Sequence, residues 1–153
     1  MSRRNRIAAS LAFVALAFGM LASSATPASE PVLGSRDFAA PYGAGFGSVQ
    51  PQVISNGGVP SGMMEEISWR HWGEATAFGR GLGHQYKPRG GYYRKRVKVR
   101  LKAERLGTCP GSKRPAYTRL RAKFQKRPGG GWGPWFLWSG ADSLCEPLFR
   151  PAL

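Results

Sequence analysis

The sequence has few of the residues from which catalytic and metal sites are usually built. It holds two histidines and two cysteines, and its eight aspartates and glutamates stand against 23 lysines and arginines. Zinc sites draw their ligands mainly from cysteine and histidine, and His71 and His84 lie far from both cysteines without paired spacing. A covalent catalytic centre needs a nucleophile beside a base. We therefore predict no metal, no cofactor and no catalytic residue; His71, His84 and Glu74 are the candidates that a small hydrolase would use.

Long hydrophobic runs are also scarce, and the clearest one lies at the start of the chain. Three arginines among the first six residues precede an uncharged apolar run at 7–22, which small residues at 23–25 follow. At about 16 residues this run is shorter than the roughly 20 that span a bilayer, and the pattern is typical of a secretory signal peptide. We predict cleavage after Ala25 and a secreted protein, extracellular or cell-wall associated, with no membrane span after processing. An uncleaved anchor is the alternative, and the general secretory and twin-arginine routes both stay open.

Acidic residues remain scarce after the predicted cleavage. Residues 1–25 hold three arginines and no acids, so the formal charge falls only from +15 to +12. The mature protein is therefore basic, and its length suits one domain. Residues 26–64 are rich in glycine and proline and poor in bulky apolar residues, which predicts a flexible leader because folding would cost entropy and bury little. Some of its side chains could still dock locally on the domain: Phe38, Tyr42, Phe46, Val53 and Ile54.

Residues 65–153 have apolar residues that recur with a period of two, as on half-buried strands. The clearest case is 96–102, where Val97, Val99 and Leu101 alternate with basic residues, and 118–124 alternates in the same way. Further strands are predicted at 65–72, 75–78 and 135–138. The glycine-rich stretch 79–91 is predicted to be a long loop, or a ragged strand around His84 to Tyr86. No segment after the signal peptide has the pattern of an amphipathic helix. We predict an all-β domain, a small antiparallel sandwich or open barrel of five or six strands.

Cys109 and Cys145 are the two cysteines, and both follow the predicted signal peptide. Export places them in a compartment that permits oxidation. We predict that they form a disulfide, whose loop contributes roughly 3 to 4 kcal/mol on the chain-entropy estimate. Such a bond matters in a domain with a modest core.

A set of short motifs is spread over residues 64–148. They are Glu66-Ile67-Ser68-Trp69, Trp72-Gly73-Glu74-Ala75, a Val-x-Val strand, Leu106-Gly107-Thr108-Cys109, Tyr117-Thr118 and the distal Cys145. In these motifs the chain resembles a loose group of small secreted actinobacterial proteins of uncharacterised function. The resemblance brings no catalytic or ligand residues to carry over, and the strands of this chain are more basic than the pattern of that group requires.

The basic residues form rows along two of the predicted strands. Alternate residues of a strand lie about 6.6 to 6.8 Å apart on one face, close to the spacing of charges on an extended polyanion. If the two strands pair, like charges face each other, and a bound anion would relieve their repulsion. The other interpretation is a solvated face whose cations protect a strand edge from aggregation. The candidate anion-binding residues are Arg94, Arg96, Lys98, Arg100 and Lys102 in one row, and Arg119, Arg121 and Lys123 in the other.

Aromatic residues accompany this charge. Trp135 and Trp138 are three apart, so on a strand they point to opposite faces and at least one could be exposed. An exposed indole beside cations could stack on a base or a sugar ring, and Tyr92 is a further candidate. We therefore predict a non-enzymatic secreted binding protein for an anionic cell-wall polymer, polysaccharide or nucleic acid. A protein-interaction or inhibitor module is the first alternative, with no protein partner indicated, and a small hydrolase is the second.

Overall fold

The computed structural model describes residues 29–149, so the predicted signal peptide lies outside the described residues. The described chain is nearly all β, and its helical turns are the short 3-10 segments η1 (Pro60–Gly62) and η2 (Trp138–Gly140). Among these residues, no helix has the length and apolar character to cross a membrane. The strands are β1 (Val32–Leu33), β2 (Ile54–Ser55), β3 (Met63–Arg70), β4 (Ala77–Gly83), β5 (Val97–Thr108), β6 (Pro115–Phe124) and β7 (Phe136–Leu137).

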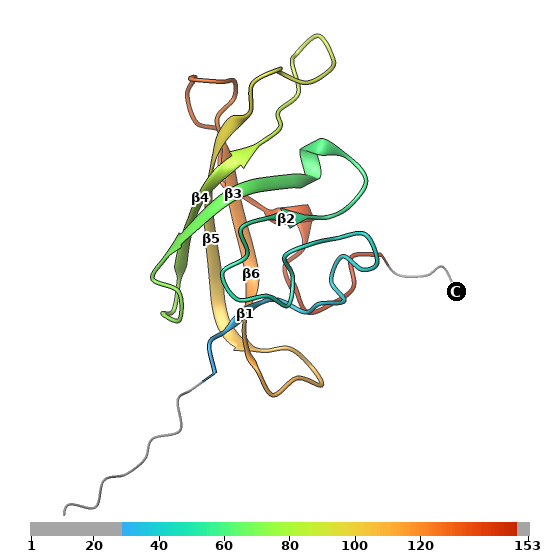
Figure 1. Cartoon of the computed structure of the whole chain (residues 1–153), viewed down its shortest axis with the longest axis vertical. Helices are drawn as coiled ribbons and strands as arrows, with labels where there is room; N and C mark the ends of the chain where they lie inside the picture. The colour runs from blue at the N-terminus through green and yellow to red at the C-terminus, as the bar shows by residue number, and fades with distance from the viewer. Residues whose placement is uncertain (1–28, 150–153) are drawn as a thin grey trace, which may run out of the picture.

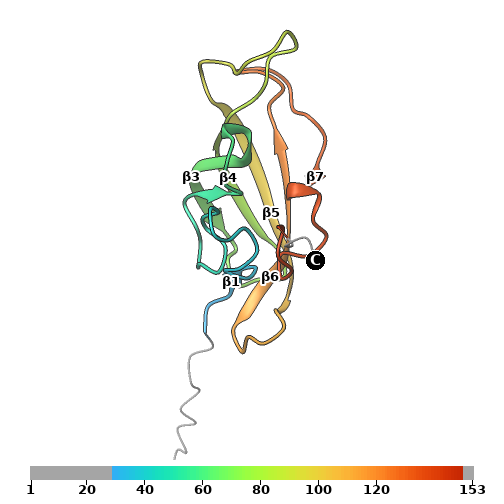
Figure 2. The same ribbon diagram turned by 90° about the vertical axis from the view of Figure 1, so that its right-hand side faces the viewer.

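The strands form one curled sheet in the order β1-β6-β5-β4-β3-β2, with β7 also paired to β6 (Figures 1 and 2). All neighbours are antiparallel except β1, which runs parallel to β6. The strands β5 and β6, of 12 and 10 residues, are the longest of the sheet and lie next to each other in it. The predicted all-β fold with an open, barrel-like curl is therefore confirmed, with seven strands instead of five or six.

Alternation in β5 and β6 decides which face of the sheet is buried. Val97, Val99 and Leu101 are at most 1% exposed, whereas Lys98 and Arg100 between them are exposed. On β6, the apolar residues predicted to alternate with basic ones lie in the same core, and they include the buried Leu120, Ala122 and Phe124. One face of the sheet is thus apolar, and the basic side chains of these strands stand on the other.

β4 extends through the region that was predicted to be a loop from residue 79 onward. After Ala77, its core-facing positions are glycines, and neighbouring side chains fill the space that a side chain would take. A Cβ at Gly83 would lie 2.5 Å from the Phe124 ring, and one at Gly79 would lie 3.0 Å from Trp69. The loop prediction is therefore wrong for 79–83. The side chains that fill the core beside β4 belong to adjacent strands, so β4 itself shows no alternation of bulky apolar and polar residues.

The segment predicted to be a flexible leader differs from that expectation in its described part, residues 29–64. Leu33, Phe38 and Ile54 are at most 1% exposed and belong to the main core cluster. Backbone hydrogen bonds fix the segment: Gly34 N–H donates to the Tyr117 carbonyl at 2.9 Å. The composition is compatible with folding because glycine allows close packing of loop against loop. This segment covers the apolar face of the sheet, as Figure 2 shows for the loops beside β1 and β3.

The predicted disulfide is present. Cys109, directly after β5, is bonded to Cys145 in the segment after η2, with a Cα–Cα distance of 5.1 Å. Next to it, buried Leu144 donates its N–H to the Thr118 carbonyl at 2.7 Å and accepts from Ser35 N–H at 2.9 Å. The bond therefore fastens a segment that is also held to β6 and to the N-terminal loops by its own contacts.

Candidate anion-binding face

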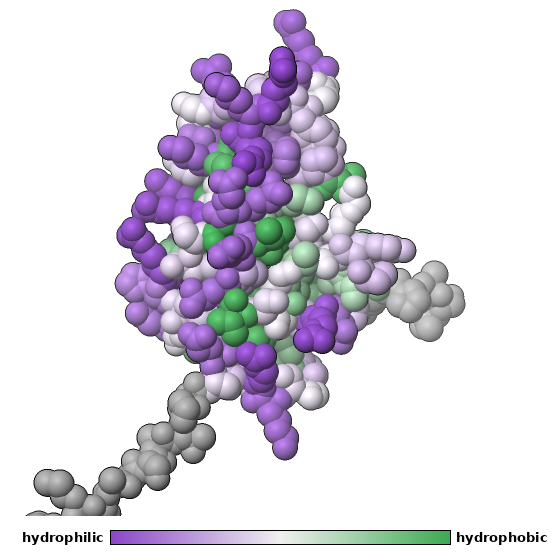
Figure 3. Space-filling view, viewed as in Figure 1, coloured by the Kyte–Doolittle hydropathy of each residue, from purple (hydrophilic) through white to green (hydrophobic). Residues whose placement is uncertain are grey.

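The face of the sheet opposite the core brings basic residues of four strands together. The register places Arg80 of β4 opposite Arg100 of β5, and Arg100 opposite Lys123 of β6. One row further along, Lys102 lies between Phe78 and Arg121. Figure 3 shows hydrophilic side chains gathered over the β3–β4 side of the molecule, with isolated hydrophobic residues among them. We call this surface the cationic face; it consists of Arg70, Phe78, Arg80, Lys98, Arg100, Lys102, Arg121, Lys123, Trp132 and Trp135.

Most cations of this face lack an acidic partner among the residues that the structure describes. Within residues 29–149, no ion pair within 4.0 Å involves Arg70, Arg80, Lys98, Arg100, Lys102 or Lys123. Arg121 is the exception, because its guanidinium lies 4.0 Å from the Glu104 carboxylate. Like charges therefore face each other across β4, β5 and β6, as was expected if the two basic strands paired, and each such pair destabilises the sheet by a few tenths of a kcal/mol or more.

Two tryptophans hold these cations in place. The guanidinium of Arg100 lies 4.5 Å from the ring centroid of Trp132. The ammonium groups of Lys102 and Lys123 lie 4.8 and 4.9 Å from the ring centroid of Trp135. A carboxylate would neutralise such a cation, whereas an indole attracts it through the ring quadrupole and leaves its charge in place. The side chains are thus oriented while their charges stay available to an anion.

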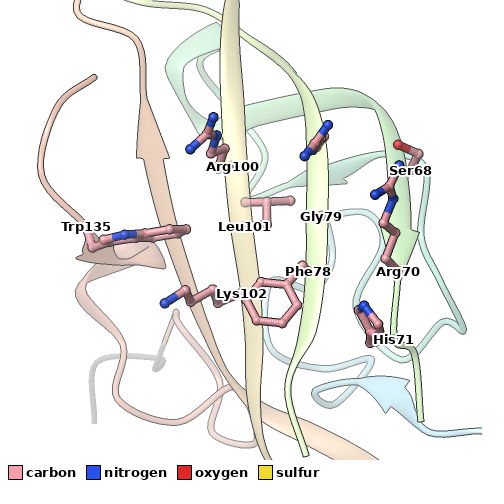
Figure 4. A pocket seen from close by; sticks show the side chains of 10 residues that line it. Ser68, Arg70, His71, Phe78, Gly79, Arg100, Leu101, Lys102 and Trp135 are labelled. Carbon is pink, nitrogen blue, oxygen red and sulfur yellow. The ribbon is translucent and has the colours of Figure 1, made fainter. Parts of the chain in front are cut away.

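Two pockets of similar size open onto the cationic face. One, of about 520 Å³, has Trp135 in its wall, and the other, of about 540 Å³, has Trp132. Ser68, Arg80 and Arg100 line both, so the two arginines stand between the pockets. Figure 4 looks into the first pocket and shows Lys102 reaching from β5 toward the edge-on indole of Trp135.

Three of the eight predicted anion-binding residues are placed differently from the other five. Arg94 is exposed but precedes β5, so it does not continue the strand row. Arg96 binds Glu66 and Glu65 at 2.5 and 2.9 Å, and these hydrogen bonds raise the pKa of Arg96. Arg119 is paired with Asp142, a residue that also binds Arg105. The remaining five, on β5 and β6, lie together on the cationic face: Lys98, Arg100, Lys102, Arg121 and Lys123.

The aromatic candidates also separate. Trp138 is 3% exposed and donates its Nε1–H to Asn56 Oδ1 at 2.8 Å, so it is a core residue. Trp135 lies on the cationic face, so the two indoles, one on each side of β7, point to opposite sides of the sheet. Tyr92 stacks on Tyr86 and donates to its hydroxyl at 2.8 Å in the loop after β4, apart from the cationic face.

Sequence reasoning missed four residues of the face: Arg70, Phe78, Arg80 and Trp132. Arg80 alternates with Gly79 and Gly81, which is a strand pattern only if glycine counts as a core-facing residue. Trp132 precedes β7 and forms an isolated bridge with Gln125, which returns it to the sheet. The position of Trp132 depends on the turn between Gln125 and Trp132, and no local sequence pattern indicates the course of that turn.

Two of the three candidate catalytic groups lie together, and the third lies apart. His71 Nδ1 lies 3.0 Å from Glu74 Oε1, and both side chains are more than half exposed. His84 lies away from them, beside the ring of Tyr92. Residues 29–149 contain no group of three or more histidine, cysteine, aspartate or glutamate side chains that could hold a metal ion. No protein-family model, curated protein or solved structure matches this chain.

Proposed function

We propose that this chain is a secreted, non-enzymatic protein that binds an anionic cell-envelope or extracellular polymer through the cationic face. The observation that carries the proposal is the group of six cations on neighbouring strands without an acidic partner among residues 29–149. A bound polyanion would offset the repulsion that the strand register creates. The disulfide agrees with export, since such bonds persist in oxidising compartments.

The arrangement of the charges favours an extended ligand over a small anion. Arg80, Arg100 and Lys123 lie across adjacent strands, which are about 4.8 Å apart. Lys98, Arg100 and Lys102 follow one strand at about 6.6 to 6.8 Å per step. A single phosphate or carboxylate could contact only a few of these groups, whereas a chain of anionic units could contact most of them. Because the indoles already orient several cations, less side-chain entropy is lost on binding.

The competing function is a protein-interaction or inhibitor module whose basic surface is merely solvated. In that case the cations keep the protein soluble and the binding surface lies elsewhere. The two alternatives differ in their salt dependence. Each neutralised phosphate of duplex DNA releases counterions, so log affinity falls linearly with log salt with a slope of about −0.9 per contact.

The test is a salt titration of binding to a duplex DNA fragment, whose phosphate spacing is known, followed by heparin and poly(glycerol phosphate). Four to six contacts predict a slope of roughly −4 to −5 with the duplex. The double variant Lys98→Gln/Arg100→Gln should flatten this slope by about two units, because two contacts are lost. Folding should survive, since both side chains are exposed.

The matched control is Lys87→Gln/Arg89→Gln, which removes the same two residue types from an exposed loop. It changes the net charge equally, but both residues lie outside the cationic face. It should therefore leave the slope nearly unchanged. Absence of binding at low salt, or equal flattening by both double variants, would refute the cationic face as the binding site.

A further inference from the structure

An exposed apolar ring stands among the cations in the end row of the cationic face. Phe78 is 44% exposed, and its strand neighbours in register are Arg70 on β3 and Lys102 on β5. The Lys102 ammonium lies 5.9 Å from the ring centroid. In Figure 4, which looks into the pocket, the ring of Phe78 is seen face-on. A broad, accessible ring face surrounded by cations is the arrangement with which proteins stack a planar group that carries nearby negative charge.

The order of groups along the face narrows the ligand further. The pocket walled by Trp135 and Phe78 and the pocket walled by Trp132 are separated by Arg80 and Arg100. The order along the face is therefore an exposed ring, Phe78, followed by a pair of cations, whereas the Trp132 ring is already in contact with Arg100. Single-stranded nucleic acid offers the matching order, because a phosphate follows each base.

Other polyanions fit this order less well. Polyphosphate and polyol phosphates have no planar ring and would leave Phe78 in water. Anionic polysaccharides carry their charges on the sugar rings themselves. Duplex DNA has the phosphates but keeps the faces of its bases stacked within the helix, so it could use only the cations.

We infer that the cationic face binds single-stranded nucleic acid, with one unpaired base stacked on Phe78 and adjacent phosphates on Arg80, Arg100 and Lys102. This inference rests on the proposed function and names its ligand class. The cations supply the salt-dependent attraction, and Phe78 supplies the preference for an exposed base.

The experiment compares three fluorescent probes at one salt concentration: oligothymidylate of about ten nucleotides, an abasic oligomer of the same length, and a duplex of the same length. The single strand should bind about tenfold more tightly than the abasic oligomer, because stacking of one base is worth about that factor. It should also bind at least as tightly as the duplex. Charge alone would reverse that second order, since the duplex has the higher charge density.

Variants locate the effect. Phe78→Leu keeps an apolar side chain and should weaken oligothymidylate binding about tenfold while leaving abasic binding and the salt slope unchanged. Phe78→Trp keeps a stacking ring and should retain the affinity. The matched control is Phe136→Leu, because Phe136 is 42% exposed but stacks on Phe124 at the opposite face of the sheet; it should not change binding.

Thermal unfolding of each variant separates a loss of stacking from a loss of fold. Equal binding of the abasic and thymidine oligomers, with no effect of Phe78→Leu, would overturn this inference and leave the proposed function standing. Preference for heparin or poly(glycerol phosphate) over oligothymidylate would also overturn it and identify the other ligand class. Failure of every polyanion to bind at low salt would overturn both proposals.

Discussion

Breaking the disulfide between Cys109 and Cys145 should lower the free energy of unfolding by about 4 kcal/mol. The cysteines are separated by 36 residues, and the entropy that a bond removes from the unfolded chain grows with the logarithm of this length. For this loop the estimate is about 13 cal/mol/K, or about 4 kcal/mol at 25 °C. Because Leu144 is buried and hydrogen-bonded to β6, the folded state should persist without the bond, and most of the loss should come from the unfolded chain.

The assay is urea unfolding followed by tryptophan fluorescence, with and without reducing agent, and on the double variant Cys109→Ala/Cys145→Ala. The reduced protein should unfold at lower urea and with a larger dependence on urea, because its unfolded chain exposes more surface. Reductant should have no effect on the double variant, which serves as the control. A loss of less than about 1 kcal/mol would refute the chain-entropy reasoning, and unfolding of the reduced protein in plain buffer would refute the claim that contacts alone retain the C-terminal segment.

Gly83→Ala should destabilise the fold, because a Cβ there would lie 2.5 Å from an aromatic carbon of the core and overpacking costs about 1 to 3 kcal/mol. Its control is Gly107→Ala in β5, where nothing lies within 4 Å of the added atom; equal losses in thermal unfolding would contradict the argument. Hydrogen bonds from Arg119 and Arg105 lower the pKa of Asp142 below its ordinary value of 3.8, so this carboxylate stabilises the fold above that value and ceases to do so as the pH falls through the lowered pKa. Asp142→Asn should therefore lower the unfolding temperature at about pH 7, and this difference should shrink as the pH is lowered below 3.8; a difference that stays constant over this range would show that the ion pairs are not its cause.

The parts of the fold that could be predicted are those whose pattern is local. In β5 and β6, a two-residue repeat of apolar and basic side chains defines the buried face whatever the rest of the chain does. The segment before β2 and the strand β4 lack such a repeat. Their packing depends on backbone that approaches a distant side chain, as Gly34 approaches Leu144 and Gly83 approaches Phe124. A glycine in the sequence does not indicate which residue will lie against it. The high glycine content of both segments, and the entropy that folding them costs, therefore favoured the prediction of loops.

The candidate site was likewise predictable only in the part that a local pattern determines. Alternation placed Lys98, Arg100 and their neighbours on one face, but it could not indicate which cations would find acidic partners. Arg96 is paired with Glu65 and Glu66, about thirty residues earlier in the chain, and Arg119 is paired with Asp142 beyond β7. These pairings follow from the fold of the chain, and only the folded structure shows which charges have no acidic partner within residues 29–149.

In β4, the constraint of packing into the core acts on one face, and the constraint of binding the proposed ligand acts on the other. After Ala77, every core-facing position of β4 is glycine, and side chains of the flanking strands specify the packing there. Phe78, Arg80 and Leu82 lie on the opposite face, so the packing of the core does not depend on which side chains they carry. These three positions could be recoded together in a combinatorial library, and ligand preference would change while the scaffold stayed constant. Natural variation has the same freedom, so related sheets could diverge in what they recognise before they diverge in how they fold.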